Sequence, residues 1–177
     1  MYERDSEKES LEMELMRETL ERGKKLRFRA LGSSMFPTIR GGDIITLEPA
    51  ELGSIRLGDL LFFQNKGQFF LHRLIKKQQI NGDPFFVTRG DNLPLPDLPF
   101  KPSQVRGKAV MLERGNRTIK FDSLFNRYFN RLMAIISPLV YFFLRIAVKS
   151  FRIISRLSLY FSSKFSSISL FSRFKGV

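Results

Sequence analysis

The chain has 177 residues, enough for one ordinary domain with a terminal appendage, and a formal net charge of +13. It has no cysteine, which excludes thiol catalysis, disulfides and thiolate metal sites, and a single histidine, which argues against a zinc site. We therefore expect neither a cofactor nor a metal.

The first region, residues 1–24, predicts an amphipathic helix. Residues 1–22 hold eight acidic and four basic side chains. The apolar positions recur near the helical period among good helix formers, at Leu11, Leu15, Met16 and Leu20. The helix should end near Gly23. No apolar stretch begins the chain, so we expect neither a signal peptide nor an N-terminal membrane anchor.

The second region, residues 25–121, has short apolar runs separated by Gly, Pro, Asp and Asn, which predicts a mainly β domain. A barrel or a sandwich-like core fits the pattern, and the lack of βαβ alternation argues against a nucleotide-binding α/β fold. The predicted strands are Leu26–Leu31, Asp43–Glu48, Asp59–Gln64, Gln68–Lys76, Phe85–Thr88, Val105–Glu113 and Arg117–Phe121.

The third region, residues 122–177, is cationic and partly apolar. From Ser123 onward it has nine basic residues and no acidic residue, which points to an anionic surface as partner. Leu132–Leu144 is mostly apolar and uncharged, but it is shorter than the about 20 residues of a membrane span. Four cations then recur on one helical face, as in a helix that lies among lipid headgroups: Arg145, Lys149, Arg152 and Arg156.

We therefore expect peripheral or re-entrant attachment to membrane lipids through residues 122–177, in preference to a full span, and no nucleic-acid partner. A helix packed on the β-core is a further alternative for this region. We also expect the β-core to be complete by Asp122, so that a chain cut there still folds.

The segment from Gly32 to Ile39 reads Gly-Ser-Ser-Met-Phe-Pro-Thr-Ile and joins two predicted strands. A serine in such a loop can project its hydroxyl into a cleft, and nearby backbone N–H groups can stabilise an oxyanion. The segment resembles the nucleophile box of type I signal peptidases, in which serine is followed by methionine, any residue and proline. The resemblance makes Ser34 the nucleophile and Ser33 its neighbour. A surface loop of small polar residues is the alternative interpretation.

A second stretch, residues 56–63, resembles the Gly-Asp strand that follows the nucleophile in that family, and it leads through a predicted hairpin to His72. Most bacterial members have a lysine base at this place. Endoplasmic-reticulum, archaeal and some Gram-positive members have histidine followed by arginine, as in this chain. An imidazole, with an unperturbed pKa of about 6.5, is mostly free to accept a serine proton near neutral pH. The resemblance implies that His72 is the general base; a purely structural histidine is the alternative.

A third stretch, residues 87–97, is similar to the family's Thr-Lys-Gly-Asp-Asn sequence, which is followed by a later aspartate. In the histidine-type members that aspartate orients the base, a role that matches Asp97 here. Asp91 fits better as a supporting carboxylate and is the second candidate, because the paired residues of the family are reduced to one each. A Pro- and Asp-rich turn away from His72 is the alternative.

The resemblance covers about Phe28 to Val110, with the stretches in the family's order. It implies a signal-peptidase-like β-fold, shared with the self-cleaving repressor peptidases, with an N-terminal helix and C-terminal membrane-associated helices. The chain departs from the family in two ways. A polar segment stands where members have a spanning helix, and Gly32 replaces the serine that assists the oxyanion hole in many bacterial members, so backbone donors must suffice.

These observations predict a membrane-associated serine endopeptidase at the cytoplasmic membrane, cleaving signal or leader peptides from a peptide or preprotein substrate. Without an anchor or export signal the domain should stay on the cytosolic side of the membrane. Secretory signal peptides, however, are cut on the opposite side. The sequence therefore does not decide on which side of the membrane the protein acts. The alternative is a non-catalytic membrane-binding module that retains the fold. A self-cleaving DNA-binding repressor would need a helix-turn-helix, for which residues 1–22 are too short and too acidic.

Overall fold

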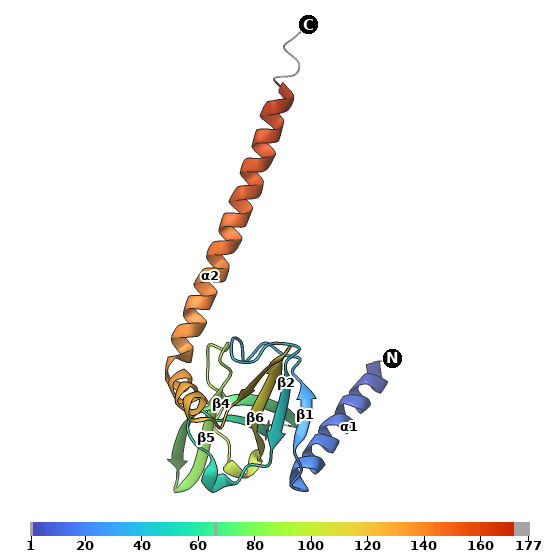
Figure 1. Cartoon of the computed structure of the whole chain (residues 1–177), viewed down its shortest axis with the longest axis vertical. Helices are drawn as coiled ribbons and strands as arrows, with labels where there is room; N and C mark the ends of the chain where they lie inside the picture. Colours follow the sequence, from blue (N-terminus) through green and yellow to red (C-terminus); the bar gives the residue numbers. More distant parts are fainter. Residues whose placement is uncertain (1, 66, 172–177) are drawn as a thin grey trace. The chain divides into compact units, whose positions relative to one another are not determined.

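The computed structural model describes residues 2–65 and 67–171, and the chain divides into two compact units, Met1–Val140 and Tyr141–Val177. Within the described residues the first unit has one seven-stranded antiparallel sheet, ordered β1-β2-β6-β3-β4-β5 with β7 paired to β6 (Figure 1). The strands are β1 Leu26–Arg29, β2 Ile44–Glu48, β3 Leu60–Asn65, β4 Gln68–Ile80, β5 Asp83–Arg89, β6 Val105–Arg114 and β7 Arg117–Lys120. The predicted mainly β class is confirmed, and the core is built on one sheet.

The hairpin between β4 and β5 shows how local sequence sets the register. Asn81 and Gly82 have φ angles of 52° and 87°, and Ile80 pairs directly with Asp83. Two consecutive positive φ angles define the turn that matches the twist of antiparallel strands, and Asn-Gly adopts it most readily. This turn extends β4 to Ile80, beyond the predicted end at Lys76.

The apolar core lies on both faces of the sheet. Along β3, Leu60 and Phe62 belong to one buried cluster, and Leu61 and Phe63 belong to another. Successive side chains of a strand point to opposite faces, so an unbroken apolar run is what a strand buried on both faces requires. The site residues of β4 are therefore presented by a central, doubly covered part of the sheet.

Helix α1 (Tyr2–Glu21) lies against this sheet through Met16 and Leu20. It ends as predicted at Gly23, whose φ of 76° allows its N–H and that of Lys24 to bond back to carbonyls of the last turn. Leu11 and Leu15, although on the apolar side of the predicted helix, are 61% and 53% exposed.

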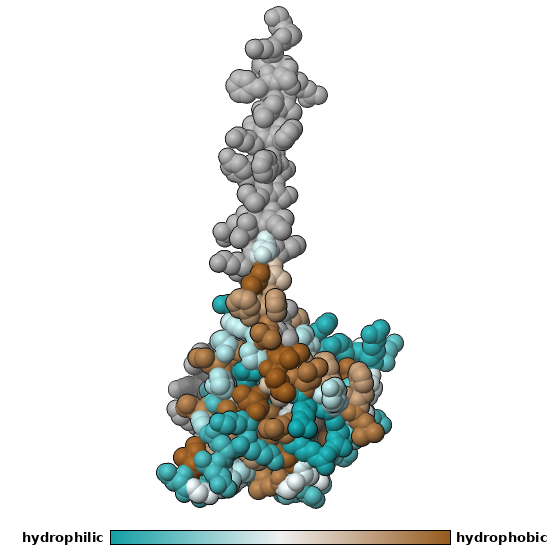
Figure 2. Space-filling view, turned by 90° about the vertical axis from the view of Figure 1, so that its left-hand side faces the viewer, coloured by the Kyte–Doolittle hydropathy of each residue, from teal (hydrophilic) through white to brown (hydrophobic). Residues whose placement is uncertain are grey.

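Helix α2 (Leu124–Phe171) begins in the first unit, where its inward side chains are Asn130, Met133 and Ser137. Those spacings of three and four define one helical face. The other face exposes apolar side chains, and Figure 2 shows brown atoms gathered over this part of α2. The most exposed of them are Leu124, Phe125, Tyr128 and Ile135.

The compact unit thus ends at Val140, whereas the sequence predicted a β domain that ends at residue 121. The difference has a physical cause: the first turns of α2 supply buried polar partners to the sheet. The backbone of Asn130 and Arg131 lies so close to Gly58 that a Cβ atom there would meet it at 2.7 Å. The expectation that a chain cut after Asp122 still folds stays a prediction; such a chain would lose the contacts of Gly58 with α2.

In the second unit α2 continues to Phe171. Of the four cations predicted to share one face, the structure describes the side chain of Arg145, which lies over the ring of Tyr141; the side chains of Lys149, Arg152 and Arg156 lie outside the described residues. Among the residues searched, no single helix has the length and apolarity of a membrane span. Leu124–Leu139 and Tyr141–Val148 meet that criterion only as a pair.

Candidate active site

Ser34 lies in the loop between β1 and β2, and its side chain is half-buried. Met35 and Ile39 anchor the loop, because both side chains are buried in the core. The N–H of Ile39 also donates a hydrogen bond to the carbonyl of Met35. The apolar anchors and the polar Ser33-Ser34 pair therefore point in different directions. This local pattern presents the hydroxyl at the surface of a fixed loop.

His72 lies in the middle of β4, and its Nε2 is 3.2 Å from the Oγ of Ser34. The imidazole side chain is only 5% exposed. It lies near the rings of Phe63 and Phe70, with centroids 6.4 and 5.7 Å away. These aromatic neighbours and the adjacent strands leave the ring few orientations, so one nitrogen faces the serine.

The other ring nitrogen, Nδ1, is 2.7 Å from Oδ2 of Asp97. The same carboxylate oxygen accepts a hydrogen bond of 2.7 Å from the hydroxyl of Thr88, and the N–H of Asp97 donates to the carbonyl of Thr88. The structure thus brings Ser34, His72 and Asp97 into one hydrogen-bonded chain. A carboxylate in this position fixes the imidazole tautomer and stabilises its protonated form.

Asp91, the second candidate carboxylate, lies elsewhere. It is fully buried and forms a bidentate pair with Arg73, with N–O distances of 2.8 and 2.7 Å. It also accepts a hydrogen bond from Thr38, in the same loop between β1 and β2 as Ser34. His72 and Arg73 are successive residues of β4, so their side chains point to opposite faces of the sheet. Asp97 therefore contacts β4 from one face, through His72, and Asp91 contacts it from the other, through Arg73.

The residues around Asp91 also hold the serine itself. The N–H of Asn92 donates to the carbonyl of Ser34 at 2.8 Å, and its side chain donates to the carbonyl of Ser33. A Cβ atom on Gly90 would lie 2.7 Å from the same Ser34 carbonyl, so only glycine allows this approach. The sequence assigned no role to Asn92 or Thr88, because each acts through a contact with a residue far away in the chain.

The end of the β1–β2 loop that leads into β2 is fixed by Asp43. Its carboxylate accepts hydrogen bonds from Arg114 and from the N–H of Arg40, and Arg114 also donates to the carbonyl of Thr38. The hydrogen bonds from Arg114 hold the pKa of the Asp43 carboxyl below its ordinary value. Two carboxylates, those of Asp91 and Asp43, therefore hold the C-terminal half of the loop between β1 and β2.

Gly32 and its neighbours bear on oxyanion stabilisation. Gly32 has open space around the position of a Cβ atom, and among the described residues the N–H of Ser34 donates no hydrogen bond.

No group of three His, Cys, Asp or Glu side chains in the searched residues could hold a metal ion. A comparison of the sequence with known protein families and with curated proteins finds no match to either.

Proposed function

We propose that the protein is a membrane-associated serine endopeptidase that cleaves signal or leader peptides, with a signal-peptidase-like fold. The observation that carries the proposal is the chain of hydrogen bonds from Ser34 through His72 to Asp97. A nucleophile, a base and an orienting carboxylate in hydrogen-bond reach are the parts that acyl transfer to serine needs.

In this mechanism the Oγ of Ser34 attacks the scissile carbonyl while Nε2 of His72 accepts its proton. The imidazolium then donates that proton to the leaving amine, and water hydrolyses the acyl-enzyme with His72 again as base. Asp97 stabilises the imidazolium, and the N–H of Ser34 stabilises the oxyanion. The 3.2 Å distance between Ser34 and His72 is of the kind that tightens when substrate binds.

The proposed place of action is the membrane surface. Exposed apolar side chains of α2, together with a basic sequence that has no acidic residue after Ser123, support binding at an anionic interface. The peptidase domain would then meet substrates that are themselves held at the membrane, as signal and leader peptides are.

The proposal is tested with purified protein and a panel of preproteins carrying signal or leader sequences. We expect Ser34→Ala and His72→Ala each to lower the rate of cleavage by about four to six orders of magnitude, because each removes an essential member of the relay. Product formation on gels and by mass spectrometry measures the rate and gives the cleaved bond.

The matched control is Ser33→Ala, which removes the same hydroxyl one residue away and should keep nearly full activity. Circular dichroism should show that all three variants are folded. Undiminished cleavage by Ser34→Ala protein contradicts the mechanism. A wild-type protein that binds membranes but cleaves none of the panel favours the alternative, a non-catalytic module.

A further inference from the structure

A positively charged groove lies away from Ser34, where the first turns of α2 meet the segment that leads into β3. It has a volume of about 500 Å³. Four of its lining side chains are cations, and the one acid among them is Asp59. The cations are Arg56, Lys77, Arg127 and Arg131.

The positive charge of this groove is not neutralised within the described part of the chain, where none of the four cations forms a salt bridge. Lys77 donates to the carbonyl of Ile55 at 2.6 Å, which holds its ammonium in place. Burial raises the pKa of the Asp59 carboxyl, and the four cations outnumber this one acid. A second cavity of about 200 Å³ shares Arg56, Asp59 and Arg127 and adds the cation Lys108 and the acid Asp122.

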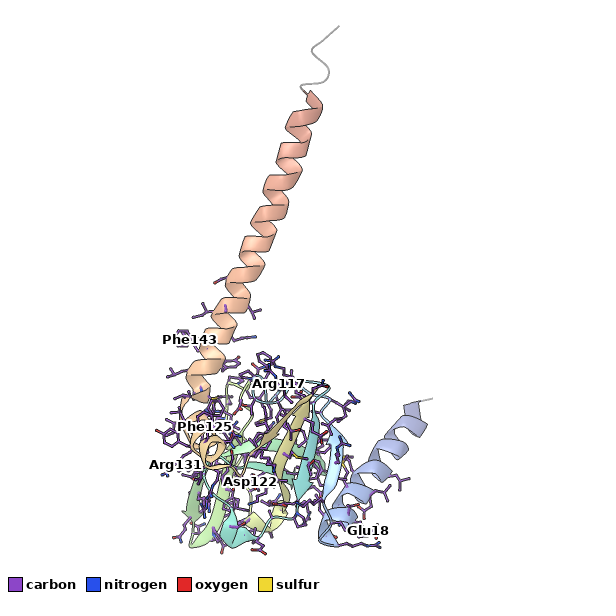
Figure 3. The ribbon with its side chains drawn as sticks, in the orientation of Figure 1. Glu18, Arg117, Asp122, Phe125, Arg131 and Phe143 are labelled. Atoms are coloured by element: carbon purple, nitrogen blue, oxygen red, sulfur yellow. The ribbon has the colours of Figure 1, made fainter. Side chains whose placement is uncertain are left out.

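The turns of α2 that carry Arg127 and Arg131 also expose apolar side chains, of which Tyr128 lines the groove. Leu124, Phe125 and Tyr128 are 84%, 77% and 74% exposed, within one turn of Arg127. Figure 3 shows Phe125 and Arg131 on this same part of the helix. A dissolved anion needs the cations alone and gives no reason for exposed aromatic side chains beside them. A lipid surface satisfies both, because aromatic rings settle at the level of the headgroups.

We propose that this groove binds the phosphate of an anionic phospholipid while Phe125 and Tyr128 enter the interface beside it. The proposal rests on the membrane association proposed above and specifies its site: a headgroup pocket in the first compact unit, in addition to the cationic sequence that follows Val140. It does not depend on peptidase activity, so Ser34→Ala protein should bind vesicles as the wild type does.

The test uses the full chain and sedimentation with two kinds of vesicle, phosphatidylcholine alone and phosphatidylcholine mixed with phosphatidylglycerol. Replacing Arg127 and Arg131 together by glutamine should weaken binding to the mixed vesicles about 25-fold, since each cation near an anionic leaflet contributes about one factor of five. The matched control replaces Lys24 and Arg117, two exposed cations outside the groove, and should change binding less than about threefold. A third variant, Phe125→Gln with Tyr128→Gln, should also lose binding.

If the groove variant and the control lose the same amount of vesicle binding, net charge alone explains the effect, and the proposed headgroup site is wrong. Saturable binding of inorganic phosphate that the groove variant loses, with vesicle binding unchanged, would assign the groove to a soluble anion and overturn it as well. If the wild type binds neither vesicle, the proposed membrane association itself fails. Cleavage of a soluble peptide, measured in parallel, reports on Ser34 and His72 separately.

Discussion

Asp91 and Asp97 are six residues apart, yet they contact successive residues of β4 that face opposite ways. Asp97 contacts His72 and is partly exposed, with 20% of its side chain accessible, whereas Asp91 is fully buried against Arg73. Removing the negative charge of the carboxylate should impair catalysis at Asp97 and stability at Asp91. At Asp97 the base loses its orienting partner, and at Asp91 a buried guanidinium loses its counter-charge.

We therefore expect Asp97→Asn to lower kcat by about 10³- to 10⁴-fold with little loss of stability. Asp91→Asn should lower the free energy of unfolding by about 3 kcal/mol or more, because Arg73 stays buried without an anion. Urea unfolding and cleavage kinetics of the two purified variants measure both effects. A stable Asp91→Asn protein with the larger catalytic defect would exchange the two roles.

Asp43 gives a prediction about pH. Because Arg114 lowers the pKa of the folded carboxyl, its contribution to stability is fully present above the unfolded pKa, near about 3.9, and is lost as the pH falls through the folded pKa. The wild type should thus be more stable than Asp43→Asn at neutral pH, and the difference should shrink below about pH 4.

Urea unfolding at a series of pH values measures this difference. Asp83→Asn is the control, since Asp83 pairs with Lys101 on the surface, where 62% of its side chain is exposed. An exposed pair contributes little, so its removal should leave the pH dependence nearly unchanged. A difference between wild type and Asp43→Asn that stays constant down to strongly acid pH would show that the ion pair does not stabilise the loop.

At the scale of elements, the strands were predictable because their signals are local. Apolar runs such as Leu60–Phe63 and turn residues such as Asn81-Gly82 fix a strand and its register without knowledge of the rest of the chain. Helix α1 and its end at Gly23 follow in the same way. The predicted end of β4 was wrong because its last residues are mostly polar. They belong to the strand only because they pair with β5, and the sequence of β4 alone does not show this pairing.

The docking of α2 was not predictable in this way. Asn130 and Ser137 look like solvent-facing positions, yet they are buried as hydrogen-bond partners of Arg73 and Arg89. Burial also lowers the pKa of the Arg89 guanidinium. The same holds for Thr88 and Asn92 at the site. The side chain of each donates a hydrogen bond to a residue outside its own element, Thr88 to Asp97 and Asn92 to Ser33.

Gly58 tests this docking directly. Its φ is +95°, and the backbone of α2 occupies the place of a Cβ atom. Gly58→Ala should therefore lower the free energy of unfolding by about 2 kcal/mol or more, through both strain and displacement of the helix. Gly53→Ala is the matched control, because nothing lies within 4 Å of its added carbon and its φ is ordinary. Thermal unfolding of the two variants gives the comparison, and equal midpoints would mean that α2 does not pack here.

At the scale of the whole molecule, one hydrogen-bond network in the first unit connects the proposed active site with the first turns of α2. Arg73 contacts Asp91 and Thr38 on the side of the nucleophile loop, and it donates to the side chain of Asn130 on α2. The first turns of α2 are thus part of the folded unit that carries Ser34.

Two truncations separate this arrangement from a self-sufficient β domain. A chain that ends after Val140 keeps Asn130, Met133 and Ser137 and should unfold within a few degrees of the full-length protein, with cleavage of a soluble peptide retained. A chain that ends after Asp122 leaves Arg73 and Arg89 without their helical partners and exposes apolar surface, at a cost of about 3 kcal/mol or more. It should therefore aggregate or unfold at a clearly lower temperature and lose activity with its fold. Calorimetry and peptide cleavage on both proteins measure the outcome. An equally stable and active Asp122 truncation would show that the sheet and its loops fold without α2.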